Sequence, residues 1–102
     1  MLRLVILYPS TKNAEFNLDY YTKHHIELVR SLVGEAATRI SVYRGVGGPG
    51  GAPAAFPISA AIDFPDMPAL ISALEQHGAQ IGQDVPNFTT ISPIIQIEEA
   101  II

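Results

Sequence analysis

Residues 16–34 have the sequence FNLDYYTKHHIELVRSLVG, which predicts an amphipathic helix. Side chains spaced three and four residues apart fall on one face of such a helix. The members of this face are Leu18, Tyr21, His25, Leu28 and Leu32. Asn17 is a favourable N-cap and Gly34 is a favourable stop, so both ends of the helix are marked. The stretch therefore predicts a helix with one buried side.

The segments before and after this helix have the composition of strands. Apolar and β-branched residues predict strands over residues 2–9, 39–46, 56–64 and 89–99. A second helix is predicted over residues 66–78, with Asp66 as its N-cap and Gly78 as its stop. Residues 79–88 are then expected to form a bridging segment. Pro93 cannot donate a hydrogen bond to a neighbouring strand, so the last strand should lie at a sheet edge or carry a bulge.

The predicted order of elements is strand, helix, strand, strand, helix, strand. With right-handed crossovers, this βαββαβ order gives a ferredoxin-like α+β fold: a four-stranded antiparallel sheet with two helices on one face. A chain of 102 residues has room for one core, so we expect a single domain over residues 1–102. The first strand is apolar on both faces, which predicts that a second copy covers the free face of the sheet. We therefore expect a homodimer.

The composition excludes several classes of function. The net charge is -4 and the six basic residues are scattered, whereas nucleic-acid binding needs a concentrated positive field. The absence of cysteine removes disulfides and thiolate catalysis, and it fits a cytoplasmic location. The apolar run at the start of the chain is too short to cross a membrane, so no membrane partner is expected. Residues 47–55, GGPGGAPAA, lack the Lys-Ser/Thr of a phosphate loop and are expected to form a mobile, dispensable connection.

The adjacent histidines at positions 24 and 25 are the strongest candidates for chemistry. His25 falls in the middle of the apolar face, where an imidazole is costly unless a partner satisfies it. It is therefore either a structural histidine bonded within the core or a pocket-lining histidine suited to proton transfer. His24 points about 100° away, so the two rings cannot readily share a metal ion. Tyr21 lies one turn before His25, where it either positions the ring or a ligand, or is a core residue with a solvated hydroxyl.

The other polar residues suggest no chemistry of their own. Tyr20 and His24 share a more exposed face of the helix, where a solvated pair is expected. Asp63 and Asp84 are acidic residues without an identifiable partner. No serine stands in a nucleophile-elbow pattern and no carboxylate pair has a suitable spacing, so hydrolysis has no support.

Three segments resemble the signatures of the EthD-domain family. Residues 16–29, FNLDYYTKHHIELV, are similar to the helix signature of the family, and residues 84–99, DVPNFTTISPIIQIEE, are similar to its C-terminal signature. ILYP at residues 6–9 also fits. The recurrent histidine of the family falls on His25. The chain departs from the family pattern at Glu27, where proline is frequent.

The resemblance implies a dimeric α+β barrel in which two sheets pack face to face. It also implies association with the oxidative degradation of ethyl tert-butyl ether or similar compounds, linked to a cytochrome P450 system. Related barrels include cofactor-independent monooxygenases, muconolactone isomerases and polyketide cyclases, and fold analogy does not choose among them.

Two functional hypotheses are consistent with these residues. In the first, the protein is a small enzyme of oxidoreductase or isomerase type that binds an apolar small molecule without a metal or other cofactor. His25 would then be a proton shuttle and Tyr21 its positioner, and Leu28, Asn87 and Phe88 are further candidates for contacts with the bound molecule. In the alternative, the protein is a non-catalytic binding or accessory protein in which His25 is a structural histidine.

Overall fold

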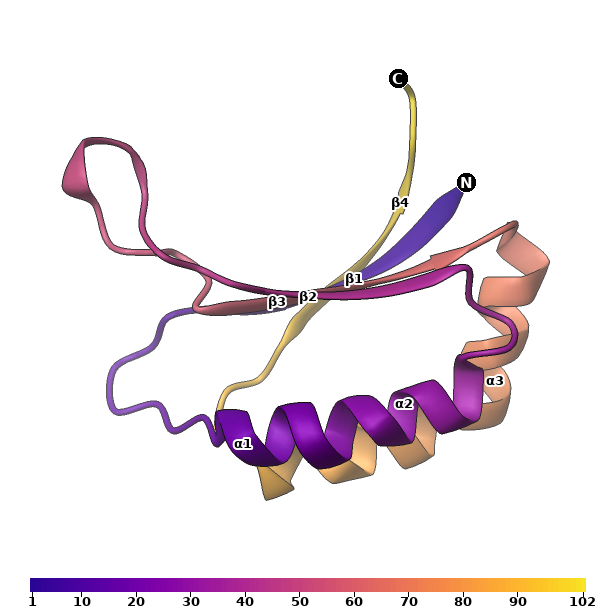
Figure 1. The fold of residues 1–102 in the computed structure, drawn as a ribbon, viewed down its shortest axis with the longest axis horizontal. Coiled ribbons are helices and arrows are strands. Elements are labelled where there is room, and N and C mark those ends of the chain that lie inside the picture. Colours follow the sequence, from indigo (N-terminus) through magenta and orange to yellow (C-terminus); the bar gives the residue numbers. More distant parts are fainter.

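The computed structural model describes all 102 residues and contains one four-stranded sheet and three α-helices (Figure 1). The strands are β1 (Leu2–Tyr8), β2 (Arg39–Arg44), β3 (Ile58–Phe64) and β4 (Ile94–Glu99). The helices are α1 (Leu18–Tyr20), α2 (Ile26–Val33) and α3 (Met67–Asp84). A π-helical turn over Tyr21–His25 joins α1 to α2, and short 3₁₀ turns cover Pro49–Gly51 and Val85–Asn87. None of the helices combines the length and the apolar composition needed to cross a membrane.

The sheet has the strand order β2-β3-β1-β4, and every neighbouring pair is antiparallel. All the helices lie on one face of it (Figure 1). This arrangement confirms the predicted ferredoxin-like α+β fold. β4 occupies an edge, as predicted from Pro93, but the strand begins at Ile94, directly after the proline, and does not run through it.

The alternation of side chains along β1 decides which face of the sheet meets the helices. Leu4 pairs with Ile62 and Tyr8 pairs with Ile58, and all four residues are buried beneath the helices. The intervening residues point to the opposite face. There Arg3 donates from Nε to Oε1 of Glu98 at 2.7 Å across the β1–β4 pair. The free face therefore carries charged as well as apolar side chains.

The core has two parts between the sheet and the helices. The first is aliphatic apart from one phenylalanine and consists of Leu2, Leu4, Val29, Val33, Ile62, Phe64, Leu70 and Ala73. The second is rich in aromatic rings and consists of Tyr8, Tyr21, Ile26, Ile58, Phe88 and Ile91. Its rings meet edge to face, with the centroids of Tyr8 and Tyr21 5.9 Å apart and those of Phe16 and Tyr21 5.0 Å apart. This aromatic part surrounds the π-helical turn.

The two predicted N-caps are present at the starts of α1 and α3. The side chain of Asn17 accepts a hydrogen bond from the backbone N–H of Tyr20 at 3.0 Å. The side chain of Asp66 accepts one from the backbone N–H of Ala69 at 2.9 Å. Both caps satisfy a backbone donor that has no partner inside the helix. The N-caps predicted from the sequence are therefore confirmed.

The buried face of the first helix differs from the prediction because of the π-helical turn. The backbone N–H of Ile26 donates to the carbonyl oxygen of Tyr21, five residues earlier. Such a turn contains one extra residue, which rotates the following helix by about 100°. The buried residues of α2 are consequently Ile26, Val29 and Val33. The expectation for Leu28 and Leu32 is corrected: both are only partly buried.

The second correction concerns Gly78, which does not end its helix. α3 continues through Gly78 and Gly82 to Asp84. A glycine ends a helix when it adopts a left-handed conformation, and Gly78 does not adopt one. Between the two glycines stand Ala79 and Gln80, which are good helix formers, and Ile81. The predicted bridging segment is thereby reduced to the single turn Val85–Asn87 and the residues that lead into β4.

The glycine-rich connection between β2 and β3 projects away from the sheet and the helices (Figure 1). Gly50 and Gly51 have φ angles of 68° and 78°, which are readily adopted only by glycine. At the base of the connection, the backbone N–H of Ser10 donates to the carbonyl oxygen of Ala55 at 2.9 Å. The connection is therefore tied to the body of the protein only at its base.

Candidate functional site

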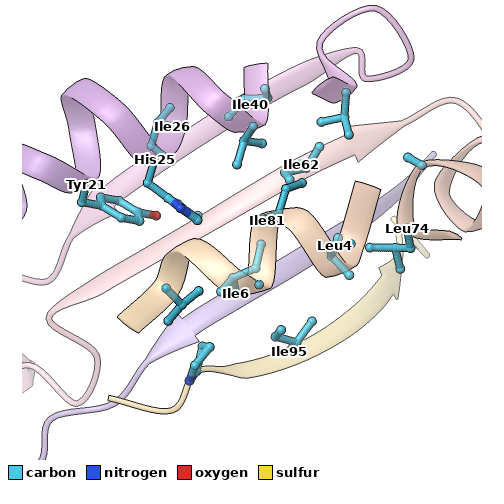
Figure 2. Close-up of a pocket in the computed structure, with 18 of the residues that line it drawn as sticks. Leu4, Ile6, Tyr21, His25, Ile26, Ile40, Ile62, Leu74, Ile81 and Ile95 are labelled. Atoms are coloured by element: carbon cyan, nitrogen blue, oxygen red, sulfur yellow. The ribbon is translucent and has the colours of Figure 1, made fainter. Parts of the chain in front are cut away.

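A cavity of ≈ 140 Å³ lies between the sheet and the helices (Figure 2). All four strands contribute to its wall, and so do the π-helical turn, α2 and α3. Of the 20 lining residues, 16 are hydrophobic, and none is acidic, lysine or arginine. The residues with polar side chains are Tyr8, Tyr21 and His25. A nearly apolar cavity with a few polar groups is typical of a small-molecule site.

His25 enters this cavity from the π-helical turn and is fixed by Asp84. Its side chain is 6% exposed, and its Nδ1 atom lies 2.9 Å from Oδ2 of Asp84. A carboxylate accepts hydrogen bonds, so this contact assigns the ring hydrogen to Nδ1. Nε2 then carries the free lone pair. No hydrogen bond within the chain engages Nε2 and the atom is not sealed from solvent, so it is available to a molecule in the cavity.

Asp84, the last residue of α3, is held by two further donors. The hydroxyl of Tyr20 donates to Oδ1 at 2.7 Å, and the side-chain amide of Asn87 donates to the same oxygen at 2.9 Å. Burial acts to raise the pKa of Asp84, but the hydrogen bonds that the carboxylate accepts outweigh this effect, and its pKa lies below the ordinary value of 3.8. The hydrogen bond that the Tyr20 hydroxyl donates to Asp84 raises the pKa of Tyr20. Asp84 is thus kept as an oriented anion next to His25.

Two aromatic rings, which also contact each other, pack against the imidazole. The ring of Tyr21 is stacked on that of His25 with 5.6 Å between centroids, and the ring of Phe88 lies 4.6 Å away. Tyr8 and Tyr21 themselves are 2% and 1% exposed, and neither hydroxyl has a hydrogen-bond partner in the chain. Burial raises the pKa of Tyr8 to about 12 and raises that of Tyr21 as well. Both hydroxyls therefore remain protonated donors.

The sequence matches the EthD domain family over residues 9–92. The chain belongs to the EthD family. An EthD-like protein of Ralstonia eutropha JMP134 is 32% identical, with a TM-score of 0.89, and the match covers 99% of this chain and 92% of that one. An ethyl tert-butyl ether (EthD) family protein of Bacillus halodurans C-125 is 23% identical, with a TM-score of 0.79 and 99% of both chains covered. No curated protein matches the sequence.

The EthD fold is shared with more distant proteins. An antibiotic biosynthesis monooxygenase has a TM-score of 0.53 at 13% identity, with both chains fully covered. HapK from Hahella chejuensis has a TM-score of 0.57 at 13% identity, covering 97% of this chain and 92% of HapK. At this level of identity the similarity establishes the fold alone, and the chemistry of this EthD chain must be argued from its own side chains.

The structure places the predicted site residues of this EthD chain in three different positions. Tyr21 and His25 line the cavity together. Phe88 packs behind the imidazole and Asn87 holds Asp84, so both lie outside the cavity wall. Leu28 does not line the cavity, because the π-helical turn rotates it away from the buried face. No cluster of three metal-ligating side chains occurs in the chain.

Two members of the site, Asp84 and Tyr20, were not predicted. The sequence left Asp84 without a partner and grouped Tyr20 with His24 in solvent. The rings of Tyr20 and His24 are indeed 4.9 Å apart, but the Tyr20 hydroxyl reaches Asp84. One signal for Asp84 was present: it opens the EthD signature DVPNF, whose Asn87 and Phe88 also contact the site.

Proposed function

We propose that this EthD protein binds a neutral, apolar small molecule in the cavity and that His25 takes a proton from it. The single observation that carries the proposal is the 2.9 Å contact between Nδ1 of His25 and Oδ2 of Asp84, which leaves Nε2 available inside an apolar cavity. A carboxylate in this position fixes the tautomer and the orientation of the ring, and it stabilises the imidazolium formed after proton transfer.

The cavity wall supports a neutral ligand. It contains no lysine or arginine to pair with a permanent anion and no carboxylate to pair with a permanent cation. Moving a charged group from water into such surroundings without a partner is costly. Hydrocarbon surface, in contrast, gains free energy when it leaves water, by roughly 25 cal/mol per Å². The bound molecule is therefore mostly hydrocarbon, with a small polar part at the His25 end.

A role in the oxidative degradation of ethyl tert-butyl ether or similar compounds, beside a cytochrome P450 system, is part of this proposal. Its support is membership of the EthD family and the ether in the name of the Bacillus halodurans relative. A dialkyl ether has no proton acidic enough for an imidazole to remove. The chemistry of His25 therefore suits a compound formed by oxidation of the ether more than the ether itself.

We also propose that the protein acts as a homodimer through the free face of the sheet. Three rows of side chains cross this face. The first alternates in charge and contains Arg39, Asp63, Arg3 and Glu98, and the second contains Tyr43, Ser59, Leu7 and Ile94. Between them lies a third row of Ser41, Ala61, Val5 and Gln96. In the second row Tyr43 is 58% exposed and Ile94 is 52% exposed. Apolar surface of this kind is stabilised when a second copy covers it.

Deuterium exchange into small aryl ketones in D₂O, followed by NMR, tests the proton transfer. The native protein is expected to accelerate exchange at the carbon next to the carbonyl. His25→Gln should reduce this acceleration by about 10²–10⁴, the usual contribution of general acid–base catalysis. His24→Gln is the matched control, because His24 is exposed and outside the cavity. This variant should accelerate ketone exchange as much as the native protein does.

Two results would refute the catalytic proposal. One is ketone exchange in the native protein no faster than in buffer, together with no enhanced ionisation of a phenol bound in the cavity. The other is unchanged exchange in His25→Gln. Either result, together with retained binding of a neutral aromatic compound such as 4-nitroanisole, would support the non-catalytic alternative. In that case His25→Gln should instead cost about 1–3 kcal/mol of stability, because the largely buried carboxylate of Asp84 loses one of its three donors.

A further inference from the structure

Tyr8 and Tyr21 place two hydroxyls in the cavity wall without any partner in the chain. Tyr8 comes from the end of β1 and Tyr21 from the π-helical turn, and their ring centroids are 5.9 Å apart. Both residues are almost fully buried. Figure 2 shows the hydroxyl oxygen of Tyr21 directed toward the His25 ring. Neither hydroxyl oxygen is sealed from solvent, so each can donate a hydrogen bond to a molecule in the cavity, which phenylalanine at the same position could not do.

We infer that the bound molecule has an oxygen that becomes negatively charged when His25 takes the proton, and that Tyr8 and Tyr21 donate hydrogen bonds to this oxyanion. The inference rests on the proposed function of His25 and adds the chemical class of the substrate. That class is a neutral compound that forms an oxyanion by losing one proton: an enolisable carbonyl compound or a phenol.

The electrostatics of the cavity support this class. A negative charge formed inside needs compensation, and no lysine or arginine is present to supply it. The available sources are the two tyrosine O–H dipoles and the imidazolium that proton transfer creates. Burial keeps both tyrosines protonated, with the pKa of Tyr8 at about 12, so they act as donors. Hydrogen-bond donors placed where charge develops in a water-poor cavity are an effective way to stabilise an oxyanion.

For a carbonyl compound, the step balances without any further reagent. The C–H bond next to the carbonyl breaks and its proton goes to Nε2 of His25. The electron pair of that bond forms a C=C double bond, and the carbonyl π pair moves onto oxygen. The product is an enolate beside an imidazolium, which Asp84 stabilises through Nδ1. For a phenol, the O–H bond breaks and the pair stays on oxygen. The reverse step returns the proton.

The experiment compares 4-nitrophenol, whose neutral and ionised forms absorb at different wavelengths, with 4-nitroanisole, which cannot ionise. Both are titrated against the native protein and against Tyr8→Phe, Tyr21→Phe and His24→Gln. The native protein is expected to bind nitrophenol with a larger ionised fraction than in buffer at the same pH. Each Tyr→Phe change should weaken binding of the ionised form about tenfold, the usual effect of one hydrogen bond to a charge. Nitroanisole affinity should change less than about twofold, and His24→Gln should match the native protein.

The outcomes separate this inference from the proposed function. If nitroanisole binds but nitrophenol ionisation is not enhanced, or if the Tyr→Phe variants bind the ionised form normally, the oxyanion inference is wrong while the cavity remains a binding site. If neither compound binds the native protein, both ideas fail. The ketone exchange experiment decides whether the substrate is a carbonyl compound or a phenol. Ketone exchange that is slower in both Tyr→Phe variants than in the native protein supports a carbonyl substrate. Enhanced nitrophenol ionisation without ketone exchange supports a phenol.

Discussion

His25 and Asp84 are 59 residues apart in the sequence, yet Nδ1 of the histidine lies 2.9 Å from Oδ2 of the aspartate. The contact joins the π-helical turn before α2 to the last residue of α3. Both side chains are largely buried, so the pair forms only when the C-terminal end of α3 is seated against the first helix. The orientation of the proposed base therefore depends on the packing of two helices.

Replacing Asp84 with asparagine tests this dependence. The variant keeps the shape of the side chain but removes the negative charge that holds the Nδ1 tautomer. Ketone exchange is expected to fall by roughly 10²–10⁴, as when the carboxylate partner of a catalytic histidine is lost. Glu75→Gln is the matched control, since Glu75 is exposed on α3 and does not line the cavity. Ketone exchange as fast with Asp84→Asn as with the native protein would show that the carboxylate does not position the base.

The lowered pKa of Asp84 predicts acid sensitivity. The hydrogen bonds from Asn87, Tyr20 and His25 favour the ionised form in the folded state only. Their contribution to stability is present above the ordinary pKa of 3.8 and is lost as the pH falls through the lower folded value. The free energy of unfolding, measured in urea between pH 6 and 2, should therefore fall less steeply in Asp84→Asn than in the native protein. Parallel curves would contradict this linkage.

Gly82 is predicted to set the size of molecule that the cavity accepts. It contributes to the cavity wall from α3 at an exposed position, and a Cβ atom added there would meet no atom within 4 Å. Gly82→Ala should raise stability by about 0.5–1 kcal/mol, because alanine is the better helix former. Gly82→Leu should fold but weaken nitroanisole binding more than tenfold by filling the cavity. Gln83→Ala, at an exposed position, is the control for helix propensity. Unchanged binding in Gly82→Leu would place the ligand elsewhere.

Light scattering at micromolar concentration tests the proposed dimer. We expect twice the mass of the 11.0 kDa chain. A double variant, Tyr43→Arg and Ile94→Arg, should dissociate it, because both residues are exposed on the free face and two added charges per chain would repel their copies. A folded native monomer would contradict the dimer proposal.

The glycine-rich connection should be dispensable for folding. Its residues 47–53 are mostly exposed and bury little apolar surface. Removing residues 48–53 while keeping Ala55, which accepts the hydrogen bond from Ser10, should leave the melting temperature within a few degrees. A much larger decrease would mean that the connection packs against the body of the protein or against a second copy.

Features of the fold that depend on local chemistry could be predicted. The two N-caps at Asn17 and Asp66 follow from hydrogen bonding within one helical turn, and the last strand lies at a sheet edge, as predicted, although it begins only after Pro93. His25 was recognised as buried because its position among apolar residues is set by spacing close to it in the chain. These are short-range relationships, and a sequence contains them directly.

The features that were predicted wrongly depend on packing between residues far apart in the sequence. The π-helical turn inserts one residue, so that Tyr21 and His25 are buried on the same side as Ile26, Val29 and Val33 of α2, and no local pattern marks it. Gly78 has the composition of a stop, but packing of α3 along the sheet keeps it helical. With the helix assumed to end there, Asp84 could not be placed beside the histidine. The wrongly predicted helix end at Gly78 is therefore the reason that Asp84 was not recognised as the partner of His25.

The position of β1 also has a consequence for the order of events during folding. β1 lies in the middle of the sheet, and Leu2 pairs with Glu99 on one side and with Phe64 on the other. Because β1 precedes the other three strands in the sequence, it must remain unpaired during synthesis until the later strands have been made. Contacts so distant in sequence slow folding, because a long loop must close before they can form. We expect refolding on a timescale slower than that of helical proteins of the same length, with closure of the β1–β4 edge as a late step.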